Sequence, residues 1–146
     1  MPRQEPGSRF SPIAALQADA SAGTLYASSS TANTVTEYSL RSGTLIGTLG
    51  ASSGINGNPE GMFFTKSHLY VTNGNQVLVF PVGQMTPSLT LQEPPSVEPF
   101  EADVAVGRNG TVYVANYIVN YSGPGIVVVF GIVSQGVVYE RAASVA

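Results

Sequence analysis

Three carboxylates have the types and positions in this sequence that could do chemistry. Glu60 and Glu101 occupy comparable positions, each shortly after a proline and shortly before an apolar stretch, and Asp103 lies two residues beyond Glu101. Oxygen ligands of this kind suit a hard cation such as Ca²⁺, which takes roughly six to eight of them. Two or three carboxylates do not complete such a shell, so the alternative is a solvated rim that binds no ion. We treat Glu60, Glu101 and Asp103 as candidate ligand-binding residues.

Two tyrosines form a second candidate binding group. Tyr117 and Tyr121 lie in a long polar segment, Asn116–Gly125, that separates two apolar runs. Long loops often carry function, and an aromatic ring there could stack on a sugar or on a partner protein. The alternative is that both rings only cover the structure beneath the loop.

Signals for catalysis are weak throughout the sequence. The one histidine, His68, follows Lys66 and Ser67 and has no acid near it in sequence, which is typical of a solvated turn residue. No nucleophile elbow, phosphate-binding loop or paired-histidine spacing occurs. The absence of cysteine excludes thiolate nucleophiles and cysteine-bound zinc. We therefore assign no catalytic residue and no cofactor, and expect a binding protein more than an enzyme.

The composition excludes several classes of partner. Charged residues make up 10% of the 146-residue chain, whereas about 25% is typical of soluble domains. The six cationic residues are scattered, so no basic patch can neutralise a nucleic-acid backbone or dock on an anionic membrane.

Membrane and targeting signals are also absent from the sequence. The most apolar run, Ile126–Val133, is far shorter than the roughly 20 residues of a spanning helix, and residues 1–20 lack the apolar core of a signal peptide. The compartment is therefore not identified.

An internal repeat organises the whole chain. Three short β-branched or aliphatic segments share a tyrosine, at Tyr26, Tyr70 and Tyr113, with spacings of 44 and 43 residues. Repeats of this period are the sequence signature of modular architectures.

Three further elements recur around each tyrosine in the same order. An apolar stretch precedes it, at Ile13–Leu16, Met62–Phe64 and Val104–Val106. A β-branched run that ends in an aromatic follows it, at Thr34–Tyr38, Gln76–Phe80 and Ile126–Phe130. A fourth apolar stretch closes each copy, at Thr44–Leu49, Ser88–Leu91 and Gly136–Tyr139. Glycine, serine and asparagine separate these elements, as hairpin turns require.

Each copy thus predicts four short strands, which is the content of one β-propeller blade. The fold class is all-β: a partial β-propeller of three four-stranded antiparallel blades, in a single repeat domain spanning 1–146. We expect blade 1 at about 11–50, blade 2 at about 58–92 and blade 3 at about 98–140. Because blades are held together by packing against each other, we expect the repeated Tyr70, Tyr113, Val71, Val114, Phe80 and Phe130 to be largely buried.

The repeat resembles a known family. Residues Tyr70–Asn73 spell the signature of the YVTN-type propeller repeat, and the wider pattern resembles NHL repeats, best over Pro99–Phe130. The copy at Pro12–Tyr38 departs most, with Ser28-Ser29 where asparagine or aspartate is usual. Such propellers serve as binding scaffolds, adhesion modules and enzymes, so the resemblance indicates the fold more than the function.

The resemblance leaves the function open between a non-enzymatic binding or interaction scaffold, which we favour, and a metal-dependent hydrolase. Relatives of the gluconolactonase or lactonase kind hold a divalent ion with carboxylates and asparagine in the central channel. In that alternative Ca²⁺ near Glu60 and Glu101 is the implied cofactor.

Three blades leave an open face at each end of the array, because propellers usually close with four to eight blades. Two copies could close a six-bladed ring as a homodimer. The alternative is a fragment of a longer secreted propeller, which would be extracellular or periplasmic.

Overall fold

The structure, a computed structural model, describes residues 12–94, 101–116, 125–133 and 136–145. Within these ranges the regular elements are strands, apart from one short 3-10 turn, η1 (Ala51–Ser53). The described part of the chain holds no helix that is long and apolar enough to cross a membrane. The expected all-β class is therefore confirmed.

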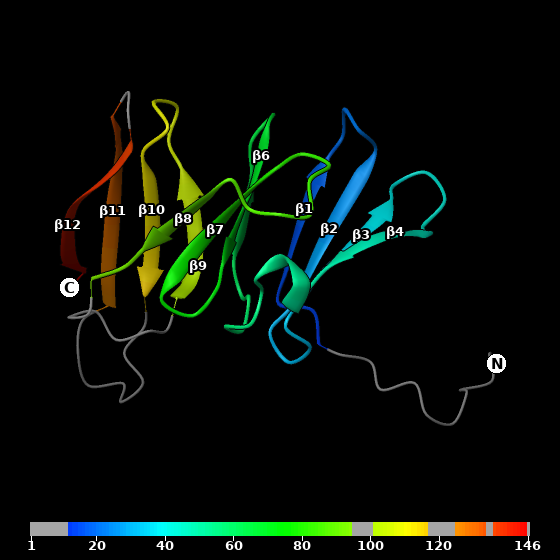
Figure 1. The fold of residues 1–146 in the computed structure, drawn as a ribbon, viewed down its shortest axis with the longest axis horizontal. Helices are drawn as coiled ribbons and strands as arrows, with labels where there is room; N and C mark the ends of the chain where they lie inside the picture. The colour runs from blue at the N-terminus through cyan, green and yellow to red at the C-terminus, as the bar shows by residue number, and fades with distance from the viewer. Residues whose placement is uncertain (1–11, 95–100, 117–124, 134–135, 146) are drawn as a thin grey trace.

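The described strands form three four-stranded antiparallel sheets, each in sequence order, and we keep the name blade for each sheet. Blade 1 contains β1 (Ala15–Asp19), β2 (Thr24–Ser29), β3 (Thr34–Ser39) and β4 (Leu45–Leu49). Blade 2 contains β5 (Met62–Phe64), β6 (His68–Thr72), β7 (Gln76–Pro81) and β8 (Leu89–Gln92). Blade 3 contains β9 (Glu101–Val106), β10 (Val112–Asn116), β11 (Gly125–Val133) and β12 (Gly136–Val145). Figure 1 shows the blades side by side, with blade 2 between the other two.

Several strands differ in their bounds from the segments that the repeat predicts: β9 begins at Glu101 and not at Val104, β11 extends to Val133, and β1 and β12 also differ. The first strand of blade 1 lies at Ala15–Asp19 and not at Ile13–Leu16. Asp19 accepts hydrogen bonds through Oδ1 from the backbone N atoms of Ser21 and Ala22, at 3.0 and 3.1 Å, so the turn begins only after Asp19. The last strand, β12, extends to Val145 because it pairs with β11 along its full length.

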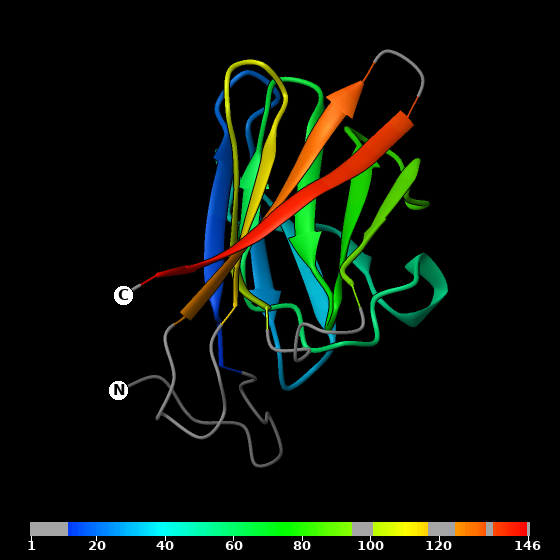
Figure 2. The same cartoon turned by 90° about the vertical axis from the view of Figure 1, so that its left-hand side faces the viewer.

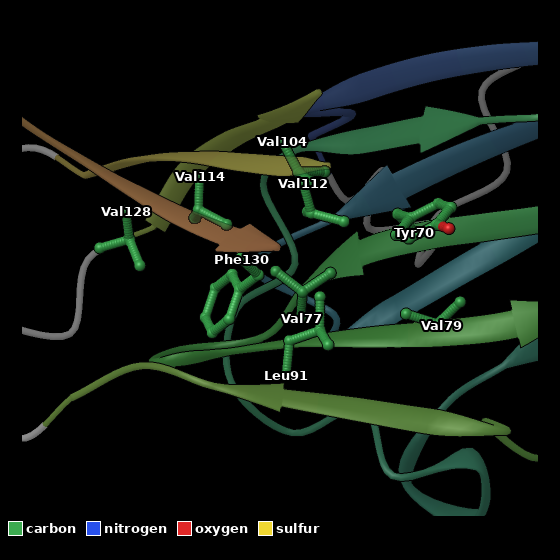
Figure 3. Packing of buried hydrophobic residues seen from close by; sticks show 9 residues of the cluster. All are labelled: Tyr70, Val77, Val79, Leu91, Val104, Val112, Val114, Val128 and Phe130. Carbon is green, nitrogen blue, oxygen red and sulfur yellow. The ribbon is translucent and has the colours of Figure 1, made fainter. Parts of the chain in front are cut away.

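The core consists of two apolar clusters, one at each junction between blades. The first joins blade 1 to blade 2 and is built from Tyr26, Val35, Leu49, Ile55, Met62, Leu69, Val71, Leu78 and Phe80. The second joins blade 2 to blade 3, and Figure 3 shows its residues Tyr70, Val77, Val79, Leu91, Val104, Val112, Val114, Val128 and Phe130. Successive side chains of a strand point to opposite faces. A central strand such as β7 therefore contributes Val77 and Val79 to one cluster and Leu78 and Phe80 to the other.

Five of the six repeated residues that we expect in the core are buried, and the sixth is exposed. Tyr70, Val71, Val114, Phe80 and Phe130 are buried. Tyr113 is 42% exposed, so the expectation of burial is wrong for this residue. Its position in the sheet matches that of Tyr70, but it lies on the face of blade 3 that has no following blade among the described residues.

The first strands of the blades lie next to each other. β1 contacts β5, and β5 contacts β9, while each fourth strand lies at the opposite edge of its sheet. Figure 2 views the array from the blade 3 side, with the long β11–β12 hairpin nearest the viewer. Residues at the ends of the first strands are therefore the ones that the fold brings toward a common surface.

Candidate functional site

Hydrogen bonds to its backbone hold Glu60 in place at the junction of blades 1 and 2. It lies between the buried Pro59 and strand β5, and its backbone N donates to Oγ1 of Thr72 at 3.2 Å. Its backbone O accepts from Oγ of Ser28, in blade 1, at 3.3 Å. Both polar backbone atoms of Glu60 are therefore fixed by side chains of two blades, and neither of these contacts uses the carboxylate.

Glu60 is one of the residues that line a small polar hollow of about 190 Å³. The other residues that line it are Ser30, Thr31 and Asn58. Ser30 and Thr31 come from the turn between β2 and β3, whereas Asn58 comes from the linker that enters blade 2. The hollow thus lies across the blade junction and presents hydroxyl, amide and carboxylate groups.

The rim of this hollow is fixed by two asparagines with left-handed backbone conformations. Asn33 has φ 53° and Asn58 has φ 55°, a region that asparagine tolerates better than most residues. The backbone N of Asn58 donates to Oδ1 of Asn33 at 2.8 Å. This bond ties the β2–β3 turn of blade 1 to the linker before blade 2.

Asp103, the other candidate carboxylate whose side chain is described, does not line the Glu60 hollow. It is exposed on β9, and its Oδ1 accepts from the backbone N of Val104 at 2.9 Å. It lines a separate hollow of about 160 Å³ on the open face of blade 3, together with Tyr113, Ala115 and neighbouring apolar residues. The structure therefore places Glu60 and Asp103 in different hollows.

The remaining predicted site residues are only partly described. The backbone of Glu101 begins β9 and pairs with Asn116, but its side chain lies outside the described residues. Tyr117 and Tyr121 also lie outside them. Within the described ranges no group of three or more histidine, aspartate or glutamate side chains is gathered closely enough to hold a metal ion.

Sequence reasoning missed a buried polar pair between blades 2 and 3. Glu93 and Asn116 are both buried, and Nδ2 of Asn116 donates to Oε1 of Glu93 at 2.8 Å. The other oxygen of each side chain, Oε2 of Glu93 and Oδ1 of Asn116, has no hydrogen-bond partner among the described residues. Burial raises the pKa of Glu93 above its ordinary value, and the hydrogen bond from Asn116 opposes that rise.

A buried tyrosine and a half-buried glutamate also lie at the junction of blades 1 and 2. Tyr26 and Glu37 are paired neighbours on β2 and β3. Burial raises the pKa of Glu37, and burial with the nearby Glu37 and Asp19 carboxylates raises the pKa of Tyr26. These groups lie between blades and not in the Glu60 hollow, so we interpret them as part of the packing.

Comparison with solved structures identifies the fold. The chain is similar to hydrazine synthase of Kuenenia stuttgartiensis, with a TM-score of 0.63 and 17% identity over 86% of this chain and 36% of that one. It is similar to the quinohemoprotein alcohol dehydrogenase of Comamonas testosteroni, with a TM-score of 0.56 and 18% identity over 74% of this chain and 18% of that one.

A third structure, a functionally unknown protein from Desulfotomaculum acetoxidans DSM 771, has a TM-score of 0.57 and 21% identity over 82% of this chain and 38% of that one. This chain thus spans well under half of each of the three structures. No protein-family model matches the chain, and no curated protein does so. At these identities the likeness concerns the fold alone, and it shows that the three antiparallel sheets are blades of the β-propeller type.

Proposed function

We propose that this chain is a non-enzymatic binding or interaction scaffold built from propeller repeats of the NHL/YVTN type. The observation that carries the proposal is the Glu60 hollow, which residues of two blades line together and in which the backbone of Glu60 is fixed by hydrogen bonds. Rigid repeats with variable loops suit recognition, because the turns can change while the blades keep their positions.

The size of the hollow indicates what it could accept. Sites for drug-sized molecules measure roughly 300–1,000 Å³, and this hollow measures about 190 Å³. It therefore suits one projecting group of a partner. Because its lining combines a carboxylate with hydroxyl and amide groups, a cationic or hydrogen-bond-donating side chain of a protein partner is the best match.

One such contact binds only weakly. An exposed ion pair contributes about 0–1 kcal/mol, so tight binding of a partner requires further contacts on neighbouring turns. This requirement favours a scaffold that recognises a protein over many weak contacts, with Glu60 fixing the register of the partner.

The metal-dependent hydrolase is the alternative, and the arrangement of the possible metal ligands favours the scaffold. A Ca²⁺ site needs several oxygens around one point, whereas Glu60 and Asp103 line separate hollows. A hydrolase site would therefore have to draw on Glu60 together with groups other than Asp103.

Nuclear magnetic resonance titration of the ¹⁵N-labelled chain tests the proposal, with arginine amide as the probe. We expect saturable shifts at the amides of Ser30, Thr31 and their neighbours, lost in Glu60→Gln and retained in the matched variant Asp103→Asn. The backbone contacts of Glu60 do not involve its carboxylate, so Glu60→Gln should fold normally. Absence of these shifts in the native chain would refute the hollow as a binding surface.

A parallel measurement addresses the hydrolase. The chain is dialysed against CaCl₂ and then against metal-free buffer, and bound calcium is determined. One retained ion per chain that is lost in Glu60→Gln would overturn the scaffold in favour of metal-dependent chemistry.

A further inference from the structure

The second strand of each blade carries a tyrosine at the same position, and the three tyrosines differ in burial. Tyr26 is 3% exposed, Tyr70 8% and Tyr113 42%. Tyr26 stacks on Phe64 of blade 2, with ring centroids 5.8 Å apart. Tyr70 belongs to the cluster that joins blade 2 to blade 3 (Figure 3). Each of these two tyrosines thus packs on the next blade, and Tyr113 is the one whose next blade is absent from the described structure.

The strand register identifies equivalent positions on the first strands of the three blades. In each blade one residue of the first strand pairs with the residue that follows the tyrosine. These pairs are Leu16 with Ala27, Met62 with Val71, and Val104 with Val114. Leu16, Met62 and Val104 therefore occupy equivalent positions on the three blades.

Two of these equivalent residues are buried at the junction with the preceding blade. Met62 is 2% exposed and lies in the cluster that contains Tyr26, and Val104 is 3% exposed and lies in the cluster that contains Tyr70. Leu16 is 56% exposed, because no blade precedes it among the described residues. One of the three tyrosines, Tyr113, and one of the three first-strand residues, Leu16, are therefore not covered by a neighbouring blade among the described residues.

The surfaces around Leu16 and Tyr113 are both mainly apolar. An apolar hollow of about 450 Å³ covers the open face of blade 1, and no charged residue lines it: its residues are Ile13, Leu16, Leu25, Ala27, Tyr38, Ser39, Leu40 and Gly43. The hollow beside Tyr113 on blade 3 is also mainly apolar, with Asp103 at its border. Each open face is thus mainly apolar, as the equivalent faces are at the two internal junctions.

We propose that the open face of blade 3 packs on the open face of blade 1 of a second copy of this chain, so that Tyr113 and Leu16 enter the same junction. Two copies then form two equivalent junctions related by a two-fold axis and close a six-bladed ring. The assembly stops at the dimer because both faces of each copy are used. Six blades fall within the four to eight that propellers usually contain.

The area involved is sufficient for a stable dimer. Four strands about 4.8 Å apart and roughly 17 Å long give a blade face of about 300 Å². Two junctions cover four such faces, about 1,200 Å² in all, which lies at the lower end of the range for specific, stable interfaces. This surface is separate from the Glu60 hollow, so the proposal does not depend on the scaffold function.

Size-exclusion chromatography with light scattering at micromolar concentration tests the proposal. We expect twice the chain mass of 15.2 kDa. Leu16→Lys and Tyr113→Asp each place a charge in both junctions and should give monomers. Both residues are exposed in a single copy, so neither change should disturb its folding, which circular dichroism can verify. The control is Met85→Lys, at an exposed residue of the β7–β8 turn, which should remain a dimer.

Mixing the two variants gives the sharpest result. A heterodimer of Leu16→Lys with Tyr113→Asp contains one junction with both native residues and one in which lysine faces aspartate. We therefore expect an equimolar mixture to recover the dimer that neither variant forms alone.

Several results would overturn the proposal. A folded native monomer would show that the faces do not pair in this way. Native assemblies of indefinite size would indicate that the faces require other blades, such as those of a longer chain. A dimer that persists in Leu16→Lys and Tyr113→Asp would place the interface elsewhere.

Discussion

The side chain of Asn73 accepts a 2.7 Å hydrogen bond through Oδ1 from the backbone N of Gly57, sixteen residues earlier in the chain. The same oxygen accepts from the backbone N of Asn56 at 3.0 Å, and Nδ2 of Asn73 donates to the backbone O of Gly54 at 3.1 Å. The last residue of the Tyr70–Asn73 signature thus fixes the linker between blades 1 and 2. Asn116, which ends the corresponding segment of blade 3, contacts the next linker through Glu93.

Gly57→Ala should destabilise the chain. A Cβ at Gly57 would lie 2.6 Å from the carbonyl carbon of Asn73 and 2.7 Å from the N of Gly74, and neither backbone atom can move aside freely. Overpacking of this kind costs about 1–3 kcal/mol, which urea unfolding can measure. Gly47→Ala is the control, because its Cβ would meet only Oε2 of Glu37 at an ordinary 3.6 Å. Equal stability of the two variants would contradict the close approach at Gly57.

Asn73→Ala should also destabilise the chain, by removing the acceptor for the N–H groups of Asn56 and Gly57. A buried polar group left without its partner costs about 1–3 kcal/mol. Asn73→Asp keeps the acceptor oxygen and loses the donor to Gly54, so its unfolding free energy should fall between those of Asn73→Ala and the native chain. An Asn73→Ala variant as stable as the native chain would show that the linker holds its position without this side chain.

The regular part of the fold could be predicted from the sequence because its signals are local. Met62–Phe64 is the predicted strand β5, and the runs that end in Phe80 and Phe130 lie in β7 and β11. Alternation and β-branched residues indicate such strands directly. The position of β1 was missed because the Asp19 turn, a polar contact, decides where that hairpin begins.

Burial and the polar sites could be predicted less well, since they depend on neighbours that a repeat pattern does not contain. Tyr113 matches Tyr70 in sequence, but its exposure depends on whether a further blade covers it. Glu93 lies before a proline-rich stretch and resembles an ordinary loop acid, so its contact with Asn116 was not foreseen. The asparagine that ends this segment in blades 2 and 3, Asn73 and Asn116, was the available clue, because it recurs where a linker must be fixed.

Phe80→Ala should cost roughly 3–5 kcal/mol of stability, the usual range for removal of a buried phenylalanine. Phe80 is almost fully buried in the cluster that joins blades 1 and 2, so its loss leaves a cavity between blades. Met85→Ala, at an exposed turn residue of the same blade, is the matched control and should change stability by less than about 0.5 kcal/mol. Thermal and urea unfolding provide the measurement, and a loss below about 1 kcal/mol for Phe80→Ala would contradict its role in the junction.

Stability should fall as the pH rises above about 4.5, through the pair of Glu93 and Asn116. The pKa of Glu93 is raised by burial from an ordinary value of 4.5, so the folded chain holds this proton to higher pH than the unfolded chain does. The favourable contribution of the protonated form is complete below 4.5 and is lost as the pH rises through the folded-state pKa. Glu37, whose pKa burial also raises, acts in the same direction.

The geometry of the pair explains why the neutral acid is preferred. A protonated Glu93 can donate from Oε2 to Oδ1 of Asn116 while Oε1 accepts from Nδ2, so one proton serves both oxygens that otherwise lack a described partner. Glu93→Gln offers the same donor and acceptor without a charge. We therefore expect Glu93→Gln to match the native chain near pH 4 and to exceed its unfolding free energy at pH 8 by about 1–3 kcal/mol, the cost of an unsatisfied buried group. A Glu93→Gln variant that is less stable than the native chain at pH 8 would show that the carboxylate is ionised and stabilised where it lies.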